Sequence, residues 1–384
     1  MEKSSSCDQP IPEYPNYLNF GEYIPHYLKL EKSEDDESYF INSTLNCLTN
    51  IKSFIEYLYS YKLNSYEYFN VLYRTIKFEI IDYIKENKNQ KKLMKNRKIE
   101  EFNNLILKKI KLFENKINHD PRVLIDCIFH LFLDVNNKDN SSITSNISSL
   151  NFLNINDYNS NEFENSFMED NIKVSDNPKT EKINIVIEKT NICPNSYCGN
   201  KNIFYKFFST FHFCLQENSE NEYTIIECLN EYFKKENEES EYICSKCSHL
   251  FKIKSKTKFH KLPNDLIISI HYINKNDNNS KFYYKFEEIL DLTNCFFIEK
   301  ENIINKKYFL SSFIVCKYPK NKNKFFYTFC RKNEDSEFLI YNTNNKGVTK
   351  HGKIIKRQVN RLKNEEYDEN LSFPYVLVYS ILEN

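Results

Sequence analysis

Residues 38–58 read SYFINSTLNCLTNIKSFIEYL, and the organisation of the N-terminal half of the chain depends on this stretch. Its apolar residues recur at steps of three and four positions, which places them on one face of an amphipathic helix. These residues are Ile41, Leu45, Leu48, Ile51, Ile55 and Leu58. The spacing therefore predicts a helix that packs one side against a core.

Further helical patterns follow this stretch. Apolar periodicity continues through residues 65–86, and a more charged helical pattern covers residues 97–116. Asp120-Pro121 then opens another helix, because Asp is a good N-cap and Pro suits the first helical turn, where no intrahelical N–H bond is needed. Its expected buried residues are Val123, Leu124, Cys127, Ile128, Leu131 and Phe132.

The chain divides into four parts by composition. Residues 1–20 are polar and proline-dotted, which predicts an irregular arm, and residues 21–132 form the helical region. Residues 133–180 are rich in Asn, Ser and Asp, and such a stretch buries too little apolar area to offset its chain entropy, so we expect a disordered insertion. Residues 181–384 are β-rich.

In the β-rich part apolar residues recur at period two, as in Ile183, Ile185 and Ile187, with the polar Asn184 between the first two. Further strand candidates are Phe204–Leu215, Phe251–Leu262, Leu266–Ile273, Tyr308–Tyr318, Phe325–Cys330, Phe338–Tyr341 and Tyr375–Ile381, with a short helix at Ile225–Lys235. Helices first and mostly antiparallel strands later predict an α+β fold.

Composition excludes several function classes. Lys+Arg and Asp+Glu both number 53, so the formal charge of zero argues against a general phosphate-binding surface, and we expect no nucleic-acid partner. Four glycines in 384 residues exclude glycine-rich nucleotide-binding loops. The longest apolar stretch, Val123–Val135, is too short to span a bilayer and includes Asp126 and His130. We therefore expect no membrane partner and an intracellular protein, in the cytoplasm or the nucleus.

Two cysteine pairs give a metal signal. Cys193 and Cys198 frame four residues, and Cys244 and Cys247 frame two. Four thiolates suit tetrahedral Zn²⁺, and each short loop supplies two of them with little strain, which predicts a structural zinc site. The alternatives are unrelated core thiols that happen to be paired, or a site in which His249 serves as a ligand.

Short motifs in family order resemble those of ubiquitin-specific proteases. Residues 42–48, NSTLNCL, are similar to the first box of that family, and Asp120-Pro-Arg-Val-Leu124 falls where the family has D-A-x-E-F. Tyr242-Ile-Cys-Ser-Lys-Cys247 resembles Y-x-C-x-x-C. Leu262-Pro-Asn-Asp-Leu266, Leu290-Asp-Leu292, Tyr308-Phe-Leu310 and Tyr375-Val-Leu-Val-Tyr379 resemble later family boxes.

The resemblance implies a papain-like cysteine protease fold of the ubiquitin-specific protease type. Such a fold has a helical thumb, an antiparallel β palm and zinc-ribbon fingers, which would span about residues 190–260 here. The family chemistry needs a thiolate at a helix N-terminus, a histidine that moves the proton, and an Asp or Asn that orients the histidine. It cleaves the bond after the C-terminal glycine of ubiquitin.

The same alignment places other residues at each chemical position. Tyr39 takes the nucleophile position, and Glu34 takes that of the oxyanion-hole Asn, where a carboxylate repels a developing oxyanion. The histidine box aligns with Phe325-Phe-Tyr-Thr328, so Phe326 replaces the general base. Thr343 stands at the orienting Asp, with Asn342 one place earlier.

These substitutions indicate a pseudoprotease that lacks the Cys-His-Asp triad and binds ubiquitin, a ubiquitin-like protein or a partner in a multiprotein complex of the ubiquitin pathway. Two alternatives stay open. One is an active cysteine-type deubiquitinase in which the boxes are misaligned, and the other is a zinc-stabilised scaffold that makes no ubiquitin contact.

Overall fold

The computed structural model describes residues 39–54, 119–134, 185–216, 224–273, 286–293, 295, 307–319, 325–331, 333–336, 338–345, 348–350 and 370–382. The predicted arm 1–20, the predicted helices 65–86 and 97–116, and residues 135–180 of the predicted insertion lie outside these ranges. The helices are α1 (Tyr39–Leu48), α5 (Pro121–Asp134) and α8 (Ile225–Glu236).

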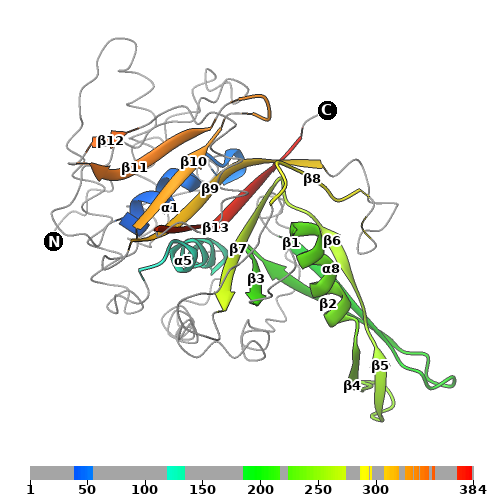
Figure 1. Ribbon diagram of the computed structural model, residues 1–384. Coiled ribbons are helices and arrows are strands. Elements are labelled where there is room, and N and C mark those ends of the chain that lie inside the picture. Colours follow the sequence, from blue (N-terminus) through cyan, green and yellow to red (C-terminus); the bar gives the residue numbers. More distant parts are fainter. Residues whose placement is uncertain are drawn as a thin grey trace, which may run out of the picture.

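A mixed sheet forms the body of the molecule (Figure 1). Its strand order is β12-β11-β10-β9-β13-β7-β3, and β8 pairs with β9 outside this path. The strands are β3 (Phe211–Gln216), β7 (Asp265–Ile273), β8 (Ile289–Asp291), β9 (Lys307–Pro319), β10 (Phe325–Cys330), β11 (Leu339–Asn345), β12 (Val348–Lys350) and β13 (Asn370–Ile381). Helices α1 and α5 lie side by side, with α1 against β9, β10 and β11 and with α5 against β13.

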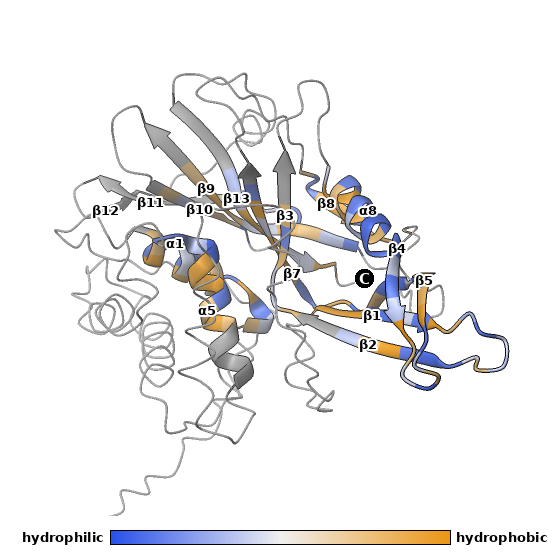
Figure 2. Cartoon of the chain, turned by 90° about the horizontal axis from the view of Figure 1, so that it is seen from below, coloured by the Kyte–Doolittle hydropathy of each residue, from blue (hydrophilic) through white to orange (hydrophobic). Residues whose placement is uncertain are grey.

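A second, smaller unit projects from this body. It consists of the three-stranded sheet β2-β1-β6, the two-stranded ribbon β4–β5, and α8. The strands are β1 (Ile185–Ile192), β2 (Lys201–Phe208), β4 (Glu239–Ile243), β5 (Leu250–Lys254) and β6 (Lys256–Lys261). Figure 2 shows how the two hairpins reach away from the sheet and from α1 and α5.

Aromatic side chains build much of the core, as expected for a chain without Trp. Phe313 of β9 stacks on Phe329 of β10 with ring centroids 4.5 Å apart. The hydroxyls of the fully buried Tyr308 and Tyr379 donate to the backbone oxygens of Pro263 and Glu287, both at 2.8 Å. Burial of the two rings is therefore achieved without leaving the phenol groups unpaired.

The predicted helix over residues 38–58 is interrupted, because α1 ends at Leu48 and residues 49–50 form a turn. The Thr49 hydroxyl donates to the Leu45 oxygen at 2.8 Å, and the Asn50 amide donates to the Asn46 oxygen at 2.6 Å. Such local side-chain bonds compete with helix continuation. Ile51 of the predicted apolar face is still buried after the turn, whereas Ile55 and Leu58 lie outside the described residues.

Two predicted strands are each split in two. The candidate Phe204–Leu215 breaks at residues 209–210, where the chain leaves the projecting sheet and β3 joins β7 in a parallel pairing. The candidate Phe251–Leu262 breaks at Ser255, since β5 pairs with β4 while β6 pairs with β1. Period-two alternation passes through both breaks, so it does not reveal a change of partner strand.

The start of α5 agrees with its predicted cap. The helix begins at Pro121, and the Arg122 backbone N–H donates to Asp120 Oδ1 at 2.8 Å. Val123, Leu124, Cys127 and Ile128 of its predicted apolar face are buried. The side chains of Leu131 and Phe132 lie outside the described residues.

Candidate functional site

The contact between α1 and β10 positions the residues aligned with the catalytic boxes. Thr328 Oγ1 donates to the Ser43 oxygen at 2.8 Å, and Cys330 Sγ donates to the Asn46 oxygen at 3.8 Å. The strand and the helix therefore run in the same sense. Two residues before Thr328, Phe326 lies toward the first turn of α1, which begins at Tyr39.

The pairing of β10 with β11 places the third aligned position. Thr328 pairs with Tyr341, and Cys330 pairs with Leu339, in antiparallel register. The paired register runs from Cys330–Leu339 to Thr328–Tyr341, and Phe326 on β10 and Thr343 on β11 each lie two residues beyond its end. The structure describes the backbone of Tyr39 and Thr343 but not their side chains, and Glu34 lies outside the described residues.

Phe326 is buried among other side chains, with 4% of its surface exposed. Its ring lies 5.5 Å from that of Tyr375 on β13, measured between centroids. The Arg122 guanidinium covers the Tyr375 ring at 3.7 Å and donates to the Tyr375 hydroxyl at 2.8 Å. Helix α5, β10 and β13 are thus joined by one stack of Arg122, Tyr375 and Phe326.

Arg122 is itself held in a buried ion pair. Its Nη2 donates to Asp120 Oδ2 at 2.6 Å, its Nε donates to Oδ1 at 3.0 Å, and its Nη1 donates to the Ile270 oxygen at 2.7 Å. Both side chains are almost fully buried. Sequence reasoning assigned Asp120 a capping role and missed Arg122, although an Arg two residues after a capping Asp could have signalled the pair.

The cysteine of α1, Cys47, is unsuited to nucleophilic attack. Cys47 is fully buried on α1, and its Sγ lies 3.3 Å from Ser312 Oγ. Burial raises the pKa of the Cys47 thiol to about 12. Only the thiolate is a good nucleophile, so Cys47 is a core thiol.

His119 lies beside the first turn of α1, and sequence reasoning also missed this residue. Its imidazole stacks on Phe40 with centroids 4.9 Å apart and an interplanar angle of 12°. The ring contributes to packing of the α1 N-terminus against the start of α5.

A second buried polar cluster lies between α5, β3 and β7. His212 Nδ1 and His271 Nε2 are 3.1 Å apart, and His212 Nε2 is 3.4 Å from Asp126 Oδ2. Burial lowers the pKa of His271 well below its usual value, and the nearby charge of Arg122 and the neighbouring His212 add to this. The sequence indicated only that these histidines sit within strands.

The neutral state of His271 predicts acid lability. Below about pH 6.5 the unfolded chain binds a proton at this residue that the native state refuses, so stability falls as pH decreases, by up to about 1.4 kcal/mol per pH unit. We expect His271→Gln to flatten the dependence of unfolding free energy on pH between about 6.5 and 5. His260→Gln, a change at an exposed ring, serves as the control in urea titrations. Equal slopes for wild type and His271→Gln would contradict this.

The four predicted zinc ligands come together in the projecting unit. Cys193 and Cys198 lie in the loop between β1 and β2, and Cys244 and Cys247 lie in the loop between β4 and β5. Cys193 Sγ is 3.8 Å from Cys247 Sγ, and Cys198 Sγ is 3.7 Å from Cys244 Sγ. All four sulfur atoms lie within 4.8 Å of one another.

This arrangement fits a tetrahedral zinc ion. With Zn–S bonds of about 2.3 Å, the sulfurs of a regular tetrahedron are about 3.8 Å apart, close to the two distances above. Backbone N–H groups of Cys247 and Lys246 lower the pKa of the Cys244 thiol to about 6, while desolvation raises that of Cys193 to about 12. His249 is outside the cluster, and its Nδ1 lies 2.7 Å from the Cys247 oxygen.

Each cysteine loop ends in a residue with left-handed backbone. Gly199 follows Cys198 with φ of 50°, and Ser248 follows Cys247 with φ of 58°. No heavy atom lies within 4 Å of a Cβ added at Gly199, so Gly199→Ala meets backbone strain alone. We expect it to destabilise the loop by about 1 kcal/mol, and Ser248→Gly to cause no such loss. Unfolding of the two variants in the presence of zinc checks this, and an unchanged Gly199→Ala midpoint would contradict it.

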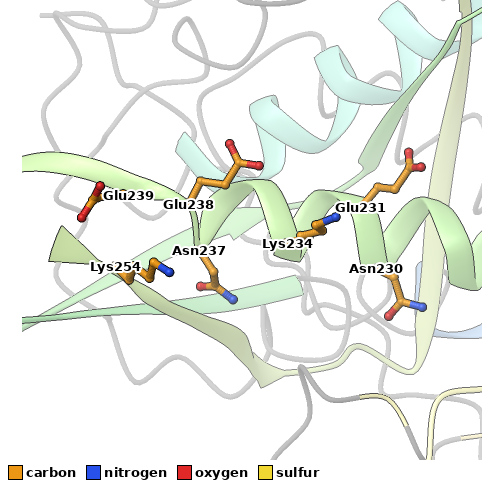
Figure 3. Close-up of a pocket in the computed structure, with 7 residues that line it drawn as sticks. All are labelled: Asn230, Glu231, Lys234, Asn237, Glu238, Glu239 and Lys254. Carbon is orange, nitrogen blue, oxygen red and sulfur yellow. The ribbon is translucent and has the colours of Figure 1, made fainter. Parts of the chain in front are cut away.

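A surface hollow lies elsewhere in the projecting unit. Its volume is about 880 Å³, and it lies between the C-terminal half of α8 and the base of the β4–β5 ribbon. Figure 3 shows its lining residues, which are Asn230, Glu231, Lys234, Asn237, Glu238, Glu239 and Lys254. Acidic and basic groups are mixed in it, and it contains no nucleophile or metal ligand cluster.

Comparison with known proteins identifies the family. The model of the ubiquitin carboxyl-terminal hydrolase family matches residues 61–378, and the chain belongs to this family. The matched span begins after α1, so the box containing Tyr39 lies just before it. The fold of the chain is the papain-like fold of the ubiquitin-specific proteases, as predicted. No curated protein sequence matches, and no described helix is long and apolar enough to cross a membrane.

Solved structures of deubiquitinating modules share this fold. The Ubp8/Sgf11/Sus1/Sgf73 module of SAGA bound to ubiquitin aldehyde contains a chain with 15% identity and a TM-score of 0.54, over 92% of this chain and 70% of that one. The Ubp8-Sgf11-Sgf73-Sus1 module matches with 14% identity and a TM-score of 0.51, over 94% and 70%. A yeast module carrying an Sgf73 Y57A mutation matches with 14% identity and a TM-score of 0.50, over 96% and 73%.

Proposed function

We propose that this chain is a pseudoprotease, a ubiquitin-specific protease-like domain that has lost hydrolysis and acts by binding ubiquitin or a partner protein of the ubiquitin pathway. In this proposal α1 and α5 belong to the thumb, the large sheet is the palm, and the projecting unit is the zinc-stabilised fingers. The observation that carries it is the position of Phe326, an apolar residue that can neither take nor return a proton.

The surroundings of Phe326 support the proposal. Tyr375 and Arg122 pack behind its ring, so the place aligned with the general base is occupied by apolar contact and a buried ion pair. The nearby thiol of Cys47 is fully buried and protonated at neutral pH. Neither group offers the Cys-His pair that acyl transfer requires.

A binding role is supported by what the chain retains. The described strands preserve the palm, and the four cysteines preserve a site for a structural ion. The solved relatives include one bound to ubiquitin aldehyde and assembled with other subunits. The partner proposed here is therefore ubiquitin, a ubiquitin-like protein or a subunit of a multiprotein complex.

Two measurements separate this proposal from its alternatives. A titration of ubiquitin into the purified chain is expected to show saturable binding, and a thiol-trapping ubiquitin-tail probe is expected to form no covalent adduct. Adduct formation would support an active deubiquitinase. Failure of ubiquitin to bind would exclude ubiquitin as the partner and leave a ubiquitin-like protein, a complex subunit or the zinc-stabilised scaffold.

A further inference from the structure

Hydrogen bonds between side-chain amides and hydroxyls join the two cysteine loops. These groups belong to residues other than the four cysteines. Asn200 is the last residue before β2, Asn202 is the second residue of β2, and Ser245 lies inside the second loop. Asn202 Nδ2 donates to Ser245 Oγ at 3.1 Å and to the Tyr242 hydroxyl at 2.8 Å. Ser245 Oγ is in turn 3.3 Å from Asn202 Oδ1, so the contact is reciprocal.

Asn200 contacts a cysteine of each loop. Its backbone oxygen accepts a hydrogen bond from the Cys193 N–H at 2.8 Å. Its side-chain Nδ2 lies 3.9 Å from Cys244 Sγ, 3.2 Å from Ser245 Oγ and 2.9 Å from Asn202 Oδ1. One residue thus fixes the first ligand of the first loop and points an N–H at the first ligand of the second.

We propose that Asn200, Asn202 and Ser245 are positioning residues that hold the two cysteine loops in register and orient Cys244 for the metal. This inference rests on the proposed zinc site. The β1–β2 hairpin and the β4–β5 ribbon belong to different sheets, so no ladder hydrogen bond aligns their loops. Groups that orient metal ligands from outside the coordination sphere raise affinity because less order is lost on binding.

Metal affinity measures the effect directly. Metal-free, reduced protein is titrated with Co²⁺, whose thiolate charge-transfer absorption reports a tetrahedral sulfur site, and Zn²⁺ affinity follows by displacement. We expect Asn202→Ala and Ser245→Ala each to weaken binding by about 10- to 100-fold. The double variant should lose less than the product of the two, because both changes remove the same contact.

Matched variants separate positioning from folding. Asn191 is the cross-strand partner of Asn202, and the side-chain oxygen of Asn191 makes no hydrogen bond. Asn191→Ala therefore removes an equivalent amide, and this variant should bind Co²⁺ as wild type does. Ser245→Thr keeps the hydroxyl and should restore affinity. Wild-type affinity in both alanine variants, or an equal loss in Asn191→Ala, would overturn the network. A wild-type chain that binds no Co²⁺ would overturn the zinc site itself.

Discussion

A fluorogenic conjugate of the ubiquitin C-terminus is expected to release no fluorophore above the buffer rate when it is incubated with this chain. The reason is that Phe326 takes the place of the general base and Tyr39 that of the nucleophile in the proposed alignment. Loss of a single nucleophile or base in a triad enzyme already costs about 10⁶-fold in rate. The loss of both leaves no route to an acyl intermediate.

A cysteine nucleophile outside the aligned position would contradict that expectation, and Cys47 is the thiol to test. Its Sγ is fully buried against Ser312, so Cys47→Ser should change neither the background rate nor ubiquitin binding. Release of fluorophore that disappears in Cys47→Ser would show that the catalytic boxes have been misaligned and that the chain is an active enzyme.

The second large effect concerns the metal. We expect about one zinc ion per chain, and we expect Cys244→Ser to abolish its retention, because four thiolates are needed to close the coordination sphere. The hydrophobic cluster at the loops is small, with Cys193, Tyr242, Cys244 and Ile253 as its buried members. Without the ion, proteolysis within residues 190–260 should accelerate by at least about tenfold, since local opening is no longer opposed.

The control for this prediction is Cys228→Ser, which alters a buried thiol of α8 outside the cluster. Cys228→Ser should keep the zinc ion, and Cys228→Ser and Cys244→Ser should both keep the palm folded. Zinc binding should weaken as pH falls, because each ligand thiol must lose its proton to bind the ion. A chain that contains no zinc, has four freely reactive thiols and melts identically after chelation would show that the cysteine pairs are bystanders.

Local sequence signals predicted secondary-structure elements more reliably than the pairing between them. The strand Phe325–Cys330 has the predicted bounds, and α5 starts at Pro121, because caps and alternation are encoded within a few residues. The family match confirms the predicted fold. The break after Leu48 and the split at Ser255 were missed, since both depend on hydrogen bonds that leave the apolar periodicity intact.

The sites divide in the same way. The structure brings together the four cysteines that spacing singled out, because each pair lies in one short loop. The Asp120–Arg122 pair, the Tyr375–Phe326 stack and the His212–His271 contact were missed. The last two contacts join segments far apart in the chain, and only the tertiary arrangement of β3, β7, β10 and β13 reveals them. Asp120 and Arg122 are two residues apart, but their burial depends on the contacts of Arg122 with β7 and β13.

Ubiquitin binding without cleavage can be tested in one sample. A ubiquitin C-terminal fluorophore conjugate is titrated with the chain while polarisation and free fluorophore are recorded together. We expect a saturable rise in polarisation, reversed by unlabelled ubiquitin, with no release of fluorophore over hours at a stoichiometric excess of protein. Release above the buffer rate, or unchanged polarisation at every protein concentration, would contradict it.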